Sequence, residues 1–433
     1  MPSARSELSP GGGRLEFFPF VATRYRDPER LSALTSPAYD LIAPKERENL
    51  AQSDEHSIVH LTLPTFGADD AQRRLRAWRS QGVLRVDVDQ ALFIYDLAEP
   101  GAGPDRRSTR GWVGSVTLVQ PGSPAISPHE ATMPAAVADR LRLLAATQAN
   151  LEPIVLTHDG DRAGSEELAH RYVAQAEPLI DLLDDGGVRH RLWPVVDRQH
   201  IAAVCADFSD RRAVIADGHH RYESYLDYQA LQRATVAGPG PWDRCLALLV
   251  PTQMHGPQVR AIHRVVPDLP LQRAVRAAAG AFRATAIGPM TAADAEDVLL
   301  SAAETTVLLT DGTEWVSLTN PDRAPLLATT PADLAAAWWD LDIALVDAGL
   351  IEGLWAASGT VALRHSVASA IETARDRSGV AVLVRPTAAA TVLDLAARGV
   401  LMPRKSTFFV PKPRTGLVMR CFVDEVDYPG PAA

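Results

Sequence analysis

Hydrophobic positions along the chain fall into strand-length runs that alternate with helix-like segments. Short apolar runs rich in β-branched and aromatic residues predict strands. They cover Phe17–Tyr25, Ile58–Leu63, Ala91–Asp96, Gly111–Val119, Thr306–Leu309 and Val380–Arg385. Segments with apolar residues on one helical face predict helices at Asp69–Gln81, Asp139–Ala149 and Ala388–Arg398. Because strands and helices mix without a regular repeat, the pattern predicts an α+β or mixed α/β fold, of which we take α+β as the expected class.

The length of the chain favours more than one domain. A chain of 433 residues exceeds what one simple core usually holds. After about residue 266 the sequence becomes rich in alanine and helical in pattern, and later returns to strands. We therefore expect a disordered tail at 1–13, an α/β part at 14–265, a C-terminal α/β domain at 266–425 and a second tail at 426–433.

Composition and charge narrow the class of protein. The chain is 46% hydrophobic and 22% charged, as globular proteins are, and its net charge of −10 argues against nucleic acid as a partner. Cys205, Cys245 and Cys421 match no zinc or redox spacing, which indicates a reducing compartment. The N-terminus shows no signal sequence, and the apolar stretch Leu334–Ala357 carries four acids, so no membrane span is expected. We expect a cytoplasmic protein, and a homo-oligomer is compatible with the sequence.

The segment Asp217-Gly218-His219-His220-Arg221 has the pattern of a phosphate-binding turn. The apolar run at 212–216 predicts a buried strand, and the apolar face at 221–235 predicts a helix. A strand, a glycine turn and a helix start together form an anion site, because unpaired N–H groups and the helix dipole favour negative charge. Arg221 could hold two phosphate oxygens, and the two imidazoles could donate hydrogen bonds.

Two other interpretations of this turn stay open. Asp217 could be an ordinary helix N-cap, with His219 and His220 merely packed. A metal site built on Asp217, His219 and His220 is a third interpretation, although adjacent residues seldom direct their side chains to one ion. The sequence of the turn by itself therefore predicts a binding site for a phosphate or a metal ion, without deciding between them.

Two further clusters carry groups suited to catalysis. Pro128-His129-Glu130 follows a predicted strand, and a glutamate there could act as a general base on a hydroxyl group. Pro403-Arg404-Lys405-Ser406-Thr407 joins cations and hydroxyls to a proline that fixes the backbone, which suits a phosphoryl group or a carboxylate. The plain alternatives are a solvated glutamate and a surface turn before the strand at 408–411.

Five segments carry a resemblance to a known family. From roughly Phe17 to Val423 the chain resembles the bacterial and archaeal family called domain of unknown function 1015. The segments are FFPFVATRY (17–25), SPAYDLI (36–42), DRLRLLAATQANLEPI (139–154), IADGHHRYES (215–224) and LMPRKSTFFVPK (401–412). That family is similar in turn to the free L-serine kinases of the ParB/sulfiredoxin-like superfamily.

The resemblance implies a fold and a set of roles. It implies a ParB/sulfiredoxin-like nucleotide-binding core with N-terminal additions, followed by the C-terminal domain. In those kinases a Pro-His-Glu supplies the catalytic glutamate, which corresponds to Glu130 here. An Asp-Gly-His-His-Arg turn binds the nucleotide phosphates there and corresponds to Asp217–Arg221. A late turn of proline, lysine and hydroxyl residues resembles Pro403–Thr407.

These observations lead to one functional prediction and two alternatives. We expect a kinase that uses ATP or ADP with Mg²⁺ to phosphorylate the hydroxyl of a small molecule, first of all free L-serine, giving O-phosphoserine. The alternatives are a regulatory module that hydrolyses its nucleotide slowly and a metal-dependent hydrolase. Phosphoryl transfer needs positioning and charge neutralisation more than covalent chemistry, so a few cations, N–H donors and one base suffice.

Each expected site residue has a role. Glu130 is the expected base, and His219, His220 and Arg221 are expected to act on the transferred phosphoryl group. The phosphate-binding set is Asp217, Gly218, His219, His220, Arg221 and Lys405, and Asp217 could also hold Mg²⁺. The substrate-binding set is His129, Lys405, Ser406 and Thr407. We expect the three segments that carry these residues to line one cleft between the N-terminal part and the C-terminal domain.

Overall fold

The computed structural model describes residues 13–100, 108–159, 163–253, 255–327, 336–357 and 359–425. The chain divides into two compact units: unit 1 comprises Met1–Pro257 with Pro411–Ala433, and unit 2 comprises Gln258–Val410. We expected the second domain to span 266–425, whereas the segment from Pro411 belongs with unit 1. The expected tails at 1–13 and 426–433 lie, apart from Gly13, outside the described residues.

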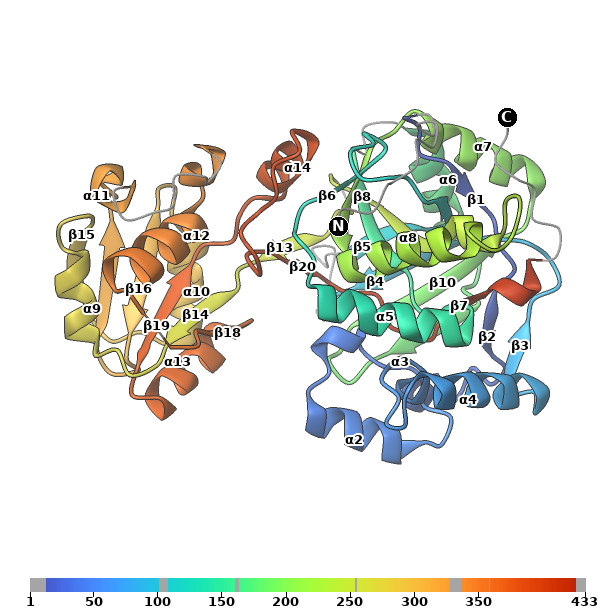
Figure 1. The fold of residues 1–433 in the computed structure, drawn as a ribbon, viewed down its shortest axis with the longest axis horizontal. Helices are drawn as coiled ribbons and strands as arrows, with labels where there is room; N and C mark the ends of the chain where they lie inside the picture. Colours follow the sequence, from blue (N-terminus) through green and yellow to red (C-terminus); the bar gives the residue numbers. More distant parts are fainter. Residues whose placement is uncertain are drawn as a thin grey trace. The chain divides into compact units, whose positions relative to one another are not determined.

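Unit 1 is built on a mixed nine-stranded sheet with the order β6-β11-β8-β12-β5-β4-β10-β9, in which β1 also pairs with β5 (Figure 1). Two pairs are parallel, β6 with β11 and β8 with β12, and the others are antiparallel. The strands are β1 (Phe17–Phe18), β4 (Leu92–Ala98), β5 (Ser108–Thr117), β6 (Ile126–Pro128), β8 (Ile154–His158), β9 (Ile180–Leu183), β10 (Arg189–Val195), β11 (Ala213–Asp217) and β12 (Arg244–Pro251).

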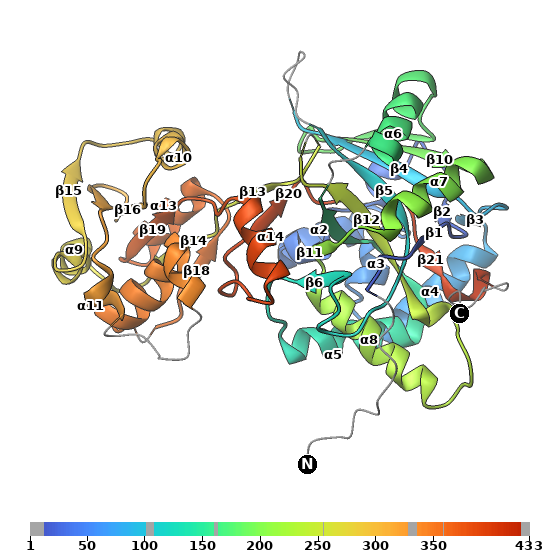
Figure 2. The same cartoon turned by 90° about the horizontal axis from the view of Figure 1, so that it is seen from above.

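Helices lie on both sides of this sheet. Figure 2 shows α6 and α7 on one side of the strands and α5 and α8 on the other. The helices of unit 1 are α1 (Leu31–Leu34), α2 (Pro44–Ser53), α3 (Val59–Thr62), α4 (Ala68–Ser80), α5 (Pro134–Thr147), α6 (Ala163–Gln175), α7 (Arg198–Ser209) and α8 (His219–Arg233). Two short antiparallel pairs complete the unit, β2 (Thr23–Tyr25) with β3 (Leu84–Val86) and β7 (Ala149–Asn150) with β21 (Arg420–Cys421).

The core of unit 1 lies between the sheet and these helices. Strands covered on both faces read as continuous apolar runs rather than alternating ones, and β12 is buried over its whole length. Phe17 of β1 meets Phe208 of α7 edge to face, with ring centroids 5.1 Å apart. On the opposite side Tyr222 of α8 donates from its hydroxyl to the carbonyl of Val119, so α8 is held against the segment that follows β5.

Unit 2 has its own sheet and core. Its six strands run in the order β15-β17-β16-β19-β14-β18, all antiparallel. They are β14 (His263–Val266), β15 (Arg283–Ile287), β16 (Thr306–Thr310), β17 (Trp315–Thr319), β18 (Ala362–Arg364) and β19 (Val380–Val384); a separate ribbon pairs β13 (Gln258–Arg260) with β20 (Phe408–Val410). The helical segments are α9 (Leu271–Ala278), α10 (Ala292–Ser301), α11 (Arg323–Leu327), a 3₁₀-helix (Ala336–Asp340), α12 (Asp342–Ala344), a π-helix (Leu345–Leu354), α13 (Val367–Asp376) and α14 (Ala389–Ala397).

Most of the elements expected from the sequence are confirmed. The strands expected at 91–96, 111–119, 306–309 and 380–385 appear as β4, β5, β16 and β19, and the expected helices appear as α4, α5 and α14. The run Phe17–Tyr25 is divided into β1 and β2, and Pro19 stands between them. The strand expected at Ile58–Leu63 is wrong, because α3 occupies this segment. Tertiary packing overrides the β-branched residues there: Ile58, Val59 and Leu61 are all fully buried.

Among the described residues, no helix is long and apolar enough to cross a membrane.

Candidate functional site

The turn between β11 and α8 is shaped by Gly218. Its φ of +95° belongs to the left-handed region that side chains disfavour. A Cβ at this position would lie 2.8 Å from Cγ2 of Ile154 and 3.0 Å from a terminal nitrogen of Arg221. Glycine is therefore needed twice, for the backbone conformation and for the close approach of these two side chains.

Helix α8 begins at His219 without a side-chain cap. Its N-cap residue is Gly218, which has no side chain that could cap the first turn. The alternative in which Asp217 is an ordinary N-cap is therefore not what the structure contains. The N-terminus of a 15-residue helix carries N–H donors and the positive end of the helix dipole, which together favour an anion.

Parallel pairing places the Pro128–Glu130 segment beside this turn. Strand β6 pairs with β11 in parallel so that Ile215 lies opposite Pro128. The segments that follow the two strands therefore leave the sheet at the same edge. The backbone N–H of His129 donates to Nε2 of His219 at 3.3 Å, and the two rings meet edge to face at 4.4 Å. Two of the three segments predicted to form the site are thus brought together.

These contacts assign the protons on the two histidines. A carbonyl oxygen can only accept, so His129 donates from Nδ1 to the carbonyl of Ile215 at 2.6 Å and its proton lies on Nδ1. His219 accepts at Nε2, and its own proton therefore lies on Nδ1 when the ring is neutral. Burial lowers the pKa of His129 to about 4, although the Ile215 carbonyl and Asp217 act in the other direction. His129 is consequently neutral at pH 7.

Glu130 and His220 occupy the rim of the turn. Glu130 follows β6 and is half-buried, as is His220 in the first turn of α8. Nearby, Thr132 donates from its hydroxyl to the carboxylate of Glu223, a hydrogen bond that ties the chain after Glu130 to α8. Glu130 therefore lies on a segment that is held to β11 on one side and to α8 on the other.

Arg221 is held by protein groups. Its side chain is 6% exposed, and it donates to the carbonyl of Pro153 at 2.7 Å and to Asp217 at 2.5 Å. Glu152 lies 3.6 Å from the guanidinium. Burial acts to lower the pKa of Arg221, but the carboxylates of Glu152 and Asp217 outweigh it and raise the pKa. The Arg221 guanidinium, which we expected to bind phosphate, is thus bonded to groups of the protein itself.

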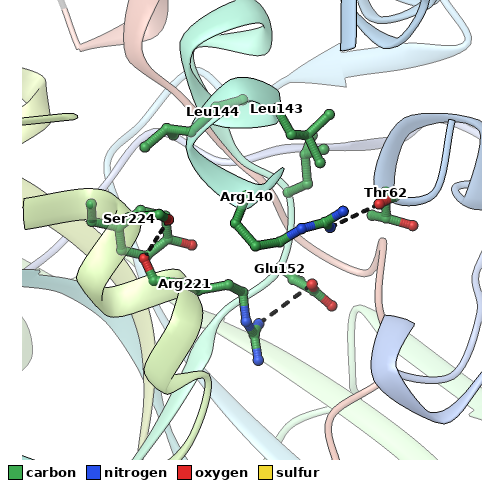
Figure 3. Close-up of a pocket in the computed structure, with 10 residues that line it drawn as sticks. Thr62, Arg140, Leu143, Leu144, Glu152, Arg221 and Ser224 are labelled. Carbon is green, nitrogen blue, oxygen red and sulfur yellow. Dashed lines mark hydrogen bonds and ion pairs between the residues drawn. The ribbon is translucent and has the colours of Figure 1, made fainter. Parts of the chain in front are cut away.

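A small cavity lies against this arginine. It has a volume of about 30 Å³, room for about one water molecule, and is lined by residues of α5, α8 and the segment 149–152. Figure 3 shows Arg221 and Glu152 facing each other there, while Arg140 donates to the carbonyl of Thr62 at 2.9 Å. The cavity is too small for a nucleotide, so it belongs to the packing beneath the turn.

Three residues that the sequence did not single out complete the charge cluster. Lys412 forms ion pairs with Asp217 at 2.6 Å and with Asp40 at 2.5 Å. Burial acts to lower the pKa of Lys412, and the two carboxylates raise it to about 12. Glu152, the third missed residue, accepts a hydrogen bond from the hydroxyl of Thr415 at 2.8 Å. The only signal was that these residues lie in or next to segments that carry the family resemblance.

The third predicted segment belongs to unit 2. Lys405, Ser406 and Thr407 lie between α14 and β20, and Lys405 has a positive φ of +53°. Ser406 and Thr407 are buried, and the hydroxyl of Ser406 has no hydrogen-bond partner in the described part of the chain. A cleft shared by all three segments stays a prediction.

The metal alternative finds no support in the described residues. Among them, no group of three or more histidine, cysteine, aspartate or glutamate side chains is placed to hold a metal ion. Both carboxylate oxygens of Asp217 already accept from cations, Arg221 on one and Lys412 on the other. Asp217 therefore does not fit as a Mg²⁺ ligand in this arrangement.

Comparison with known proteins gives a family match. A family model described as "Protein of unknown function (DUF1015)" matches residues 17–344. No curated protein matches the sequence.

Comparison with solved structures gives distant similarities. One is to a free serine kinase variant in complex with AMP, with 13% identity and a TM-score of 0.33, over 66% of this chain and 84% of that chain. Another is to SbnI with a C-terminal truncation from Staphylococcus aureus, with 11% identity and a TM-score of 0.38, over 73% and 90%. A conserved hypothetical protein from Pyrococcus furiosus has 12% identity and a TM-score of 0.31, over 66% and 87%. Scores below 0.5 support no conclusion about function.

Proposed function

This chain belongs to the DUF1015 family, and from that premise we propose that it is a nucleotide-dependent kinase that phosphorylates the hydroxyl of a small molecule, with free L-serine as the first candidate. One observation carries the proposal: the parallel pairing of β6 with β11 sets the segment that bears Glu130 beside the glycine turn that starts α8. These are the two parts, a base and an anion site, that the resemblance to ParB/sulfiredoxin-like kinases assigns to Pro128–Glu130 and Asp217–Arg221.

In this proposal the turn binds and the glutamate acts as the base. The N–H groups that begin α8, with His219 and His220, hold phosphate oxygens of ATP or ADP. Glu130 takes the proton of the substrate hydroxyl as the oxygen attacks the phosphorus. His129, neutral and bonded to the Ile215 carbonyl, fixes the backbone that presents Glu130 and supports His219.

Arg221 and Asp217 are positioning residues in this mechanism. Arg221 joins α8 to the Pro153 carbonyl and to Glu152, and Asp217 joins α8 to Lys412. These bonds keep the turn rigid, and rigid donors need no reorganisation when charge develops on the phosphoryl group. Phosphoryl transfer ordinarily uses Mg²⁺ bound to the nucleotide phosphates, but no step here is assigned to a protein-held ion. Lys405, Ser406 and Thr407 are proposed to bind the substrate.

The experiment that tests the proposal is a product screen. The purified protein is mixed with ATP or ADP, Mg²⁺ and single amino acids or other small hydroxyl compounds, and phosphorylated products are detected by mass spectrometry. We expect O-phosphoserine or the phosphate ester of a related hydroxyl compound. Without any phosphorylated product across the panel, the kinase proposal fails.

Replacing Glu130 tests the mechanism. Glu130→Gln is nearly isosteric but cannot accept the proton, so turnover should fall by roughly 10²–10⁴-fold while nucleotide affinity stays unchanged. The matched control is Glu48→Gln, an exposed carboxylate on α2, which should keep wild-type turnover. If Glu130→Gln turns over at the wild-type rate, Glu130 is not the base. If the product screen finds nucleotide binding but no phosphorylated product, the chain is better described as a regulatory module.

A further inference from the structure

The turn Pro403–Thr407 of unit 2 has a backbone conformation that its residues do not favour. Lys405 has a φ of +53°, in the left-handed region that is unfavourable for a residue with a side chain. Met402 and Ser406 are buried, whereas Arg404 and Lys405 are exposed, so two cations stand on a buried base. A strained backbone of this kind persists only where the surrounding structure fixes it. The contacts that fix this turn therefore bear on whatever it binds.

One such contact comes from a tryptophan that lies 63 positions earlier than its partner. Trp338 belongs to the 3₁₀-helix Ala336–Asp340, and its indole N–H donates to the carbonyl of Leu401 at 2.7 Å. Leu401 stands between the end of α14 and the turn, two residues before Pro403. The bond from Trp338 therefore fixes the chain at the point where it enters the turn.

A residue close to this tryptophan holds the start of the stretch that leads to the turn. Asp342, four residues after Trp338, accepts from Nε of Arg385 at 2.6 Å and from the hydroxyl of Thr305 at 2.7 Å. Arg385 follows β19 and precedes α14. The Asp342 side chain is 10% exposed, so the ion pair is screened less by salt than a surface pair is. Trp338 and Asp342 thus bond to the two ends of the stretch 385–401, which contains α14.

We propose that Trp338 and Asp342 are positioning residues that hold the Pro403–Thr407 turn in the conformation that binds the substrate. This inference rests on the proposed function, in which that turn binds the hydroxyl compound. The two residues act through the backbone of the turn and do not touch the substrate themselves. When a site is ordered for only part of the time, its apparent affinity falls by that fraction, while the bound complex stays the same. A loosened turn should therefore raise the KM for the hydroxyl compound and leave kcat unchanged.

Trp338→Phe in the full-length protein tests the inference. This variant keeps an aromatic ring but removes the N–H that bonds to Leu401. We expect the KM for the hydroxyl compound found in the product screen, L-serine first, to rise about three- to tenfold, as for one hydrogen bond. The kcat and the KM for the nucleotide should stay at wild-type values. Independently of turnover, hydrogen exchange followed by mass spectrometry should show faster exchange of the amides in residues 401–407, by a similar factor.

Trp355→Phe is the matched control. The indole N–H of Trp355 also donates to a backbone carbonyl of unit 2, that of Ala274 at 3.0 Å. Ala274 lies in α9 and not in the turn. The control therefore removes the same kind of bond, and it should change neither the exchange of residues 401–407 nor either KM.

A second variant acts at the other end of the stretch. Asp342→Asn removes the charge that pairs with Arg385, and it should shift the exchange and the KM for the hydroxyl compound in the same direction as Trp338→Phe. The proposal is overturned if Trp338→Phe leaves both quantities at wild-type values, if Trp355→Phe changes them equally, or if the exchange rises without the KM. If the wild-type chain phosphorylates nothing, the proposed function fails. The exchange data then still decide whether Trp338 holds the turn, since unchanged exchange in Trp338→Phe overturns that role.

Discussion

Asp217 is the residue at which the charges of the turn between β11 and α8 meet. One of its carboxylate oxygens accepts from Arg221 and the other from Lys412. From the sequence, Arg221 looked like a phosphate ligand because it stands in the first turn of α8. In the fold, its partners include Pro153 and Glu152, 68 and 69 positions earlier in the chain, contacts that no local pattern can predict. An arginine in the first turn of a helix can thus be bonded to residues distant in the sequence instead of to a ligand.

Removing Arg221 should therefore lower stability first. Arg221→Ala leaves the buried carboxylates of Glu152 and Asp217 without their cation, which costs on the order of 3 kcal/mol when a buried pair is broken. Urea denaturation followed by circular dichroism measures this loss. Arg142→Ala is the control, since that arginine is exposed and pairs with exposed Asp139; it should change stability by less than about 0.5 kcal/mol. Equal effects of the two variants would contradict the structural role of Arg221.

The buried histidines predict a loss of stability in mild acid. Burial lowers the pKa of His129 to about 4, below its ordinary value of about 6.5. Between these values the unfolded chain binds more protons than the folded one, so the stabilisation is complete above pH 6.5 and is lost as the pH falls toward 4. Burial also lowers the pKa values of His158 and His263, to about 3 and about 4, and adds to the same slope.

A variant isolates the contribution of His129. His129→Asn keeps a donor for the Ile215 carbonyl but cannot be protonated, so its urea midpoint should fall less than that of wild type between about pH 7 and pH 5. The control His200→Asn changes a half-exposed histidine on α7 and should follow the wild-type profile. If His129→Asn and wild type lose the same stability on acidification, His129 does not titrate in this range.

At the scale of elements, local signals predicted β11, the turn and α8, and missed what packs against them. The strand expected at 212–216 is β11 at 213–217, and the helix expected from Arg221 begins two residues earlier, at His219. Their apolar patterns match their burial, so pattern and fold agree. The parallel pairing of β6 with β11 joins segments 87 residues apart (Ala213 opposite Ile126), and only tertiary structure can specify such a pair. Tertiary structure also decides the segment Ile58–Leu63. A short segment that is buried on all sides is apolar throughout, so its sequence pattern cannot distinguish a strand from a helix.

The strand–turn–helix unit depends on the glycine at its centre. In Gly218→Ala the added Cβ meets Ile154 and Arg221, and the φ of +95° is unfavourable for alanine. Gly238→Ala is a matched control: its φ is +90°, and a Cβ there has nothing within 4 Å. The control should lose only the backbone term, about 1–2 kcal/mol, and Gly218→Ala a further 1–3 kcal/mol or so from overpacking. Similar unfolding free energies for the two variants would show that the turn relaxes around the added methyl group.

At the scale of the molecule, the last described stretch of the chain completes unit 1. Arg414 donates to the carbonyls of Ser32 and Thr35, and Arg420, fully buried, donates to those of Pro241 and Arg244. With Lys412 at Asp217, this segment bonds to regions spread along unit 1. Unit 2 is thus an insertion between β12 and the segment that closes unit 1, a topology that the expected boundary at 266 did not capture.

Because unit 2 is inserted, it should be removable, whereas the C-terminal segment should not. Gln258 and Val410 are cross-strand partners in the β13–β20 ribbon, so an Asn-Gly turn between them can replace residues 259–409. We expect this shortened chain to fold, as shown by a cooperative melt, and to bind nucleotide with the affinity of the full chain, because the Asp217 turn and Glu130 lie in unit 1. It should transfer no phosphoryl group if Lys405, Ser406 and Thr407 bind the substrate. The comparison chain ends at Val410 and loses the charged residues that close unit 1, so it should not melt cooperatively. A shortened chain that still phosphorylates at the wild-type rate would exclude the Pro403–Thr407 turn from the mechanism.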